Sequence, residues 1–132
     1  LKDSNKNNLF ITADTIVVLE DKVLGKPKDF KDAFSMLKEL SSKTHAVYTG
    51  VALLYNEKIQ SFQDSTEVTF YDLKDEEIEF YINNNQPYDK AGSYGIQEWM
   101  GYVGIKKMKG DFFNVMGLPL HRLYREIEKL FL

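Results

Sequence analysis

The chain contains no cysteine among its 132 residues, which excludes disulfide bonds and thiolate chemistry. It has two histidines, His45 and His121, which argues against a histidine-rich zinc site. No apolar run approaches the roughly 20 residues that a membrane-spanning helix needs, and the opening stretch LKDSNKNN holds no apolar signal region. The absence of cysteine fits a reducing compartment, so we expect a cytoplasmic protein with no membrane partner.

An excess of positive charge is also missing. The chain carries 17 Lys and Arg against 20 Asp and Glu, a net charge of −3. Proteins that bind nucleic acid non-specifically normally present a basic face, so we expect no nucleic-acid partner. Hydrophobic residues make up 43% of the chain and charged residues 28%, a balance typical of globular proteins. The length predicts a single domain over residues 1–132.

The residues that are present predict alternating strands and helices. Residues 11–19 are rich in Ile, Val and Thr and predict a strand, followed by a turn at residues 20–22 and a short return at residues 23–24. Apolar residues three and four apart predict a helix over residues 29–40, with Asp29 as its N-cap. The remaining expected elements are two long strands around a hairpin at residues 56–58, a short helix over KDEEIEFYINNN, a loop at 84–97, a strand at 102–108 and a helix at 119–131.

This order of elements predicts the fold class. Strands and helices alternate without internal repeats, which is typical of a mixed α/β or α+β domain built on one curved sheet.

Polar residues that look out of place gather in three stretches of the sequence. Small residues let a backbone approach a ligand closely, helix N-termini favour anions, and lysines near a carboxylate indicate a phosphate site that also holds a divalent metal. The first stretch contains Asp14, Thr15 and Lys26; the second contains Asp89, Lys90, Gly92, Ser93, Tyr94, Gly95 and Gln97; the third contains Gly110, Asp111, Asn114, Gly117 and Pro119.

Several of these residues also have a structural explanation. Asp14 could be half of an ion pair within an apolar strand, and Lys26 a solvated lysine at the start of a helix. Asp111 could be an N-cap and Asn114 a turn residue. The alternatives for the second stretch are ordinary turn glycines at positions 92 and 95 and a glutamine that braces the loop at position 97.

The stretches ADTIV, LGKPKD, THAVYTGVAL, STEVTF, DKAGSYGIQ and GDFFNVMGLPL, in this order and spacing, resemble the Maf family (septum-formation-inhibitor homologues) of nucleoside triphosphate pyrophosphatases. The resemblance runs from about residue 10 to the C-terminus. It implies an elongated, curved mixed sheet with flanking helices, as in the inosine triphosphate pyrophosphatases. The implied reaction cleaves a nucleoside triphosphate between its α and β phosphates with a divalent metal, Mg²⁺ or Mn²⁺. KAGSYGIQ resembles the branch that prefers dTTP and UTP.

The resemblance also assigns roles to individual residues. Asp14 matches the aspartate of the A-D-T motif, which is implied to activate the attacking water or hold the metal, and Thr15 is implied to bind substrate beside it. Lys26 of G-K-P and Lys90 of D-K-A-G are implied to bind phosphate. Gln97 of G-I-Q is implied to contact the substrate, and we predict that its amide pairs with the O4 and N3–H edge of uracil and thymine.

One departure from the family concerns its Ser-x-Ser-x-Arg-Arg loop, which helps to bind the triphosphate and has no counterpart between Leu1 and Asp14. We therefore expect residues 1–132 to be the C-terminal two thirds of the family domain, with negligible hydrolysis on their own. An uncovered sheet edge would be filled by a second copy of the chain, a swapped strand or an upstream piece. Two rival functions stay open at this point: a non-catalytic nucleotide-binding module and a regulatory protein of cell division.

Overall fold

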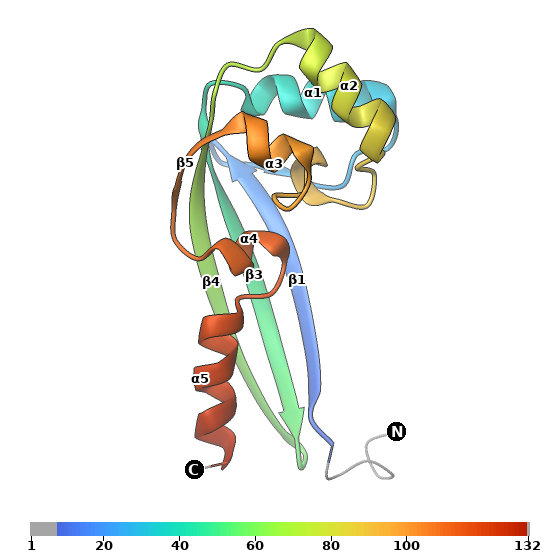
Figure 1. Ribbon diagram of the computed structural model, residues 1–132. Helices are drawn as coiled ribbons and strands as arrows, with labels where there is room; N and C mark the ends of the chain where they lie inside the picture. Colours follow the sequence, from blue (N-terminus) through green and yellow to red (C-terminus); the bar gives the residue numbers. More distant parts are fainter. Residues whose placement is uncertain (1–7, 132) are drawn as a thin grey trace.

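The computed structural model describes residues 8–131. They form one long sheet with helices at one end and along one face (Figure 1). The strands are β1 (Phe10–Leu19), β2 (Lys22–Leu24), β3 (Thr44–Tyr55), β4 (Lys58–Phe70) and β5 (Ile105–Lys109). The helices are α1 (Phe30–Leu40), α2 (Asp75–Asn85), the 3₁₀ turn η1 (Ala91–Ser93), α3 (Trp99–Gly104), α4 (Phe112–Met116) and α5 (Leu120–Phe131).

The sheet has the strand order β2-β1-β3-β4-β5, and every pair of neighbours is antiparallel. The expected α+β class with one elongated sheet is confirmed, but the mixed strand directions are not found among the described strands. β3 and β4 pair along their whole length, from Thr44 opposite Thr69 to Tyr55 opposite Lys58. β1 pairs with β3 from Phe10 to Val18, whereas β2 pairs only with residues 17–19. Within the described chain, the outer edge of β1 is therefore unpaired over residues 10–16.

The local signals read from the sequence account for most of these elements. Asp29 caps α1 by accepting a hydrogen bond from the Asp32 N–H at 2.8 Å, as predicted. Both hairpins turn through two residues with positive φ, Glu20 and Asp21 in the first and Asn56 and Glu57 in the second. This backbone twist matches that of the strands it joins, so the turns set the register of both hairpins.

Two groups of apolar side chains form the core, one at each end of the sheet. The larger group joins α1, α2 and α3 to the upper part of the strands in Figure 1 and includes Leu37, Ile82 and Met100. The smaller group lies where α5 covers the lower part of the same strands, around Leu53 and Leu123. α4 lies between the two groups, against β3 and β4.

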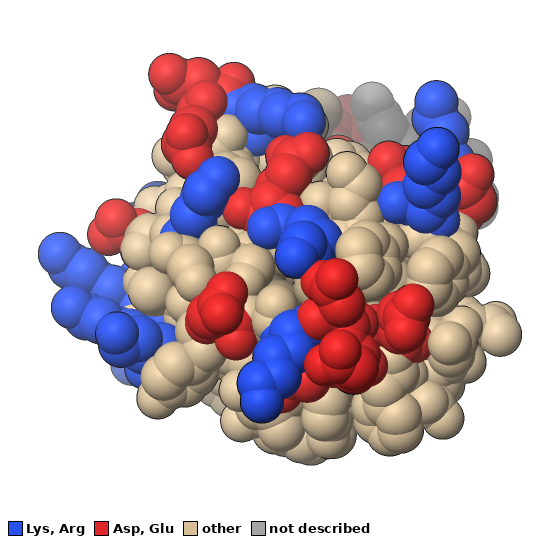
Figure 2. All heavy atoms as spheres, turned by 90° about the horizontal axis from the view of Figure 1, so that it is seen from above, with Lys and Arg blue, Asp and Glu red and all other residues tan. Residues whose placement is uncertain are grey.

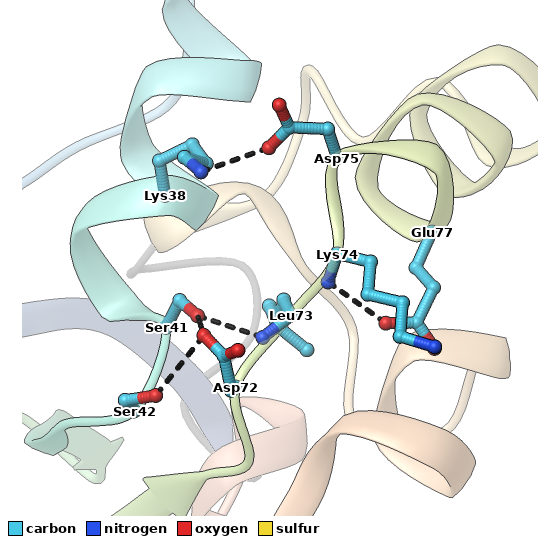
Figure 3. A network of polar contacts seen from close by, with 8 residues as sticks. All are labelled: Lys38, Ser41, Ser42, Asp72, Leu73, Lys74, Asp75 and Glu77. Atoms are coloured by element: carbon cyan, nitrogen blue, oxygen red, sulfur yellow. Dashed lines mark hydrogen bonds and ion pairs between the residues drawn. The ribbon is translucent and has the colours of Figure 1, made fainter.

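A polar network joins the end of α1 to the start of α2 (Figure 3). The Ser41 hydroxyl accepts a hydrogen bond from the Leu73 N–H at 2.7 Å and donates to Asp72 Oδ1 at 3.3 Å. Lys38 forms an ion pair with Asp75 at 2.8 Å, which raises the pKa of this lysine through the hydrogen bond and the neighbouring charge. These contacts fix the two helices relative to each other beside the larger core.

Two short helices were not expected. Residues 102–104 were predicted to begin a strand, but they complete α3, and the strand starts at Ile105. The backbone folds tightly at this point, because a Cβ at Gly101 would lie 1.8 Å from the Ile96 carbonyl oxygen. α4 was expected only as a lead into the final helix. Across residues 8–131, no helix is long and apolar enough to cross a membrane.

Candidate functional site

The predicted site residues meet at one pocket of about 280 Å³ at the unpaired edge of β1. β1 supplies one wall, the segment before α1 and the loop after α2 supply two more, and the end of α4 closes the fourth. Asp14, Thr15, Lys26, Lys90 and Gln97 all line it. The other lining residues are Ala13, Val17, Val47, Asp89, Ala91, Tyr94, Gly95, Val115, Met116 and Gly117.

Asp14 is exposed, although it lies in the middle of β1. It stands opposite Gly50 of β3, where no side chain occupies the neighbouring position of the sheet. Within the described residues its carboxylate makes no hydrogen bond or ion pair, so the ion-pair explanation is wrong here. Asp14 also borders two shallower hollows on the sheet, and its charge is therefore open to a ligand from several directions.

Thr15 begins a chain of hydrogen bonds beneath the pocket. Its hydroxyl lies 2.9 Å from that of Thr49, which in turn donates to the Asn114 carbonyl oxygen at 3.1 Å. The Asn114 side chain donates to the Val47 carbonyl at 3.1 Å and to the Thr66 hydroxyl at 3.0 Å. These bonds hold α4 against the sheet, so the pocket wall formed by its last turn has a fixed position.

Of the third polar stretch, Gly117 lines the pocket, whereas Asp111 and Asn114 support it from behind. Asp111 is the N-cap of α4, which confirms the structural explanation given for it above. It accepts a hydrogen bond from the Phe113 N–H at 2.9 Å. Asn114 is not a turn residue, because it lies fully buried inside α4. Gly117 ends α4 with a φ of 115°, a conformation that favours glycine, and brings the chain close to Thr15.

Lys26 and Lys90 reach the pocket from two segments that are joined by one backbone hydrogen bond. The Gly92 N–H donates to the Gly25 carbonyl at 3.1 Å, and a Cβ at Gly92 would lie 3.0 Å from Val17 of β1. Gly92 is thus more than an ordinary turn glycine, because its lack of a side chain allows the loop to approach the strand. Lys26 is exposed, and its ammonium has no partner among the described residues.

Lys90 is held more closely than Lys26. Its aliphatic chain lies over Gly95, where an added Cβ would stand 2.8 Å from Lys90 Cε. Its ammonium is 3.5 Å from Asp89, and the side chain is 25% exposed. A long, weak ion pair of this kind leaves the charge free to exchange its partner for an anionic ligand.

Gln97 is exposed at the rim of the pocket. Its backbone carbonyl accepts a hydrogen bond from the Tyr102 hydroxyl at 2.7 Å. Its side-chain amide has no partner in residues 8–131. The bracing of the loop is therefore done by the backbone, and the amide remains available to a ligand.

Two buried tyrosines hold the loop that carries Lys90 and Gln97. The Tyr94 hydroxyl lies 2.6 Å from His45 Nε2, and burial lowers the pKa of His45 to about 4. The Tyr81 hydroxyl accepts a hydrogen bond from the Gly95 N–H at 3.0 Å and donates to Glu98 Oε1 at 2.6 Å. Burial raises the pKa of both tyrosines, so their hydroxyls stay protonated.

Sequence reasoning did not identify His45, Tyr81 and Glu98 as residues that hold this loop in place. Tyr81 carries a signal, because it lies beside Ile82 on the buried side of α2, where a hydroxyl needs a partner. Its partners, however, belong to a loop that only the folded chain brings near.

The pocket fits a divalent metal that arrives with a phosphate ligand. Asp14 and Asp89 are the carboxylates in its lining. In the part of the chain that the structure describes, no cluster of three or more His, Cys, Asp or Glu residues could hold a metal by itself. Mg²⁺ is commonly bound by one or two carboxylates, substrate phosphates and water, and this donor set suits such an arrangement.

The surface of the helical end carries both signs of charge, as expected from 17 Lys and Arg and 20 Asp and Glu. Figure 2 shows that Lys and Arg side chains are interspersed with Asp and Glu over the end of the molecule where α1 and α2 lie. One group of Lys and Arg side chains stands apart at the left edge of this view. The face seen here therefore carries both signs of charge rather than a continuous basic surface.

Comparison with known proteins identifies relatives that are similar to this chain in sequence. Proteins named dTTP/UTP pyrophosphatase from Porphyromonas gingivalis and Phocaeicola vulgatus are 51% and 56% identical to this chain over 122 and 124 residues. These matches cover 92% and 94% of the chain but 61% and 64% of the relatives. A third protein of the same name, from Cytophaga hutchinsonii, is 54% identical over 95% of the chain and 57% of its own length.

The chain thus spans less than two thirds of the length of these relatives. The family profile described as Maf-like protein matches residues 1–130. With this match and the motif residues gathered at one pocket, the chain belongs to the Maf-like protein family.

Proposed function

We propose that this pocket hydrolyses dTTP and UTP to the nucleoside monophosphate and pyrophosphate. The observation that carries the proposal is the set of charges without firm protein partners: Asp14 and Lys26 have none in the described structure, and Lys90 has one weak contact. Unpaired charges facing a pocket imply a charged ligand. The names of the three relatives support a pyrimidine nucleoside triphosphate as that ligand.

For this reaction, the protein needs mainly to position the substrate and water and to neutralise the charge of the phosphates. The two lysines would neutralise phosphate oxygens, and Asp14 would orient the attacking water. A divalent metal, which Asp14 would help to hold, supplies Lewis-acid polarisation of the phosphate when bound. Thr15 fixes the strand beside Asp14 through its bond to Thr49, which keeps the carboxylate in register with the pocket.

Gln97 would contribute the preference for the base. Its amide can accept a hydrogen bond from N3–H and donate one to O4, the pair of groups that uracil and thymine share. Cytosine presents the opposite pattern at these positions. A free amide at the pocket rim supports this role.

The rest of the proposal concerns the setting of the reaction. We place the protein in the cytoplasm, because the absence of cysteine fits a reducing compartment. The unpaired edge of β1 also leaves room for a homodimer contact, and the net charge of −3 argues against nucleic acid as a partner.

The test is hydrolysis by the complete gene product, with residues 1–132 assayed in parallel. We expect release of pyrophosphate from dTTP and UTP with Mg²⁺ or Mn²⁺, and its loss on chelation. Asp14→Asn should lower turnover by at least about a hundredfold while nucleotide binding survives. Glu67→Gln is the matched control, since Glu67 is an exposed strand carboxylate outside the pocket.

Two outcomes would contradict the proposal. Saturable nucleotide binding without turnover in the complete protein would favour the non-catalytic binding module. Turnover by Asp14→Asn equal to that of Glu67→Gln would remove Asp14 from the mechanism.

A further inference from the structure

The Tyr81 hydroxyl is the point at which α2 meets the loop of the pocket. Tyr81 has no exposed surface, and its ring packs in the larger core group. A ring fixed in this way leaves its hydroxyl little freedom to move. Two bonds end on that oxygen, one from the Gly95 N–H and one to the Glu98 carboxylate.

These two partners lie next to the residues that face the ligand. Gly95 is the surface over which the Lys90 side chain passes, because a Cβ there would stand 2.8 Å from Lys90 Cε and 2.9 Å from Glu98 Oε1. Glu98 directly follows Gln97, and its N–H donates to the Gly95 carbonyl at 3.0 Å. One phenol therefore anchors the stretch on which both the lysine and the glutamine depend.

We propose that Tyr81 is a positioning residue, whose hydroxyl sets the placement of Lys90 and Gln97 through Gly95 and Glu98. This inference rests on the proposed function of the pocket. Tyr81 is not among the residues that line the pocket, so it acts without touching the nucleotide. Its effect falls on substrate binding, since the groups it places are those assigned to phosphate and base.

Removing the hydroxyl has a defined physical consequence. A Tyr81→Phe change keeps the ring in the core but leaves the buried Gly95 N–H without an acceptor and Glu98 without a donor. Leaving a buried N–H without an acceptor destabilises the protein more than leaving an exposed one. The loop therefore lowers its free energy by moving the Gly95 N–H toward water. Such a shift carries Lys90 and Gln97 away from their positions.

Ser41 offers a matched control in the same part of the molecule (Figure 3). Its hydroxyl also accepts one bond from a backbone N–H and donates one to a carboxylate, at Leu73 and Asp72. It lies outside the pocket lining. A Ser41→Ala change therefore removes the same kinds of bond without disturbing the pocket loop.

The experiment compares KM and kcat for dTTP and UTP in the complete protein and its two variants. Tyr81→Phe should raise KM by about tenfold with a smaller change in kcat, while Ser41→Ala leaves KM unchanged. Amide hydrogen exchange should show loss of protection at Gly95 in Tyr81→Phe alone. Glu98→Gln keeps an oxygen that can accept the hydrogen bond from the Tyr81 hydroxyl, so its KM should rise less than that of Glu98→Ala.

The possible failures are separable. If the wild-type protein does not turn over either nucleotide, the proposed function fails and this inference fails with it. If the wild type is active and Tyr81→Phe has a normal KM, or changes KM no more than Ser41→Ala, only the positioning role is overturned. A fall in melting temperature shared by both variants without a change in KM would also overturn it.

Discussion

Acid should destabilise the folded chain through His45, the buried histidine at the start of β3. The ring is 2% exposed and lies between Phe70 and Tyr94, with centroid distances of 5.3 and 5.5 Å. Its Nε2 is paired with the Tyr94 hydroxyl, whereas Nδ1 has no partner in the described structure. Protonation would therefore place a charge in the core and an N–H at Nδ1 that finds no acceptor.

The direction and size of the effect follow from the two pKa values of this residue. Burial lowers the pKa of His45 from 6.5 to about 4, so the unfolded state binds the proton more readily than the folded state. Stability is thus unaffected above pH 6.5 and is lost as the pH falls from 6.5 to about 4. At about 1.4 kcal/mol per pKa unit, protonation of the unfolded state lowers the free energy of unfolding by about 3 kcal/mol across this window.

The assay is urea unfolding at several pH values across the window, for wild type and His45→Phe. Phenylalanine keeps an aromatic ring against Phe70 but does not titrate, so the difference in unfolding free energy between the two proteins should change by about 3 kcal/mol. Carboxylates titrate equally in both and cancel. Parallel curves for wild type and His45→Phe would refute the reasoning.

Two further predictions concern the ligand. Lys26→Met and Lys90→Met should each weaken triphosphate binding by about 1.5–3 kcal/mol while nucleoside binding changes much less, as titration calorimetry can measure; equal losses for both ligands would indicate general damage. Gln97→Ala should narrow the preference for UTP over CTP in competition assays, and an unchanged ratio would leave the amide without a role in base selection.

Sequence patterns predicted the regular elements because those elements follow local rules. α1 shows apolar spacing and a capping aspartate, and Ala33, Leu37 and Leu40 are buried as that spacing requires. The β3–β4 hairpin follows from two β-rich segments around a turn. α3 and α4 were missed because six and five residues give too short a pattern to distinguish from a loop.

The residues that face the pocket were also predictable, but those behind it were not. Asp14, Lys26, Lys90 and Gln97 were identified by motif and by charge in unusual places, and the structure gathers all four at one pocket. Tyr81 belongs to no such motif and carries no charge, and the partners of its hydroxyl, Gly95 and Glu98, lie in a loop that only the folded chain brings near. Asp14 is tolerated in β1 because this stretch of strand is exposed.

The division of the core into two groups has a consequence for cooperativity. Among residues 8–131, the group under α5 contains four buried side chains, whereas the group under α1, α2 and α3 contains sixteen. Segments with few buried contacts open at lower free energy than global unfolding, as separate foldons. Detachment of α5 should therefore be the cheaper partial opening, and it leaves intact the helical end on which Lys90 and Gln97 depend. The chain thus separates its most easily opened end from the loop that requires the greatest rigidity.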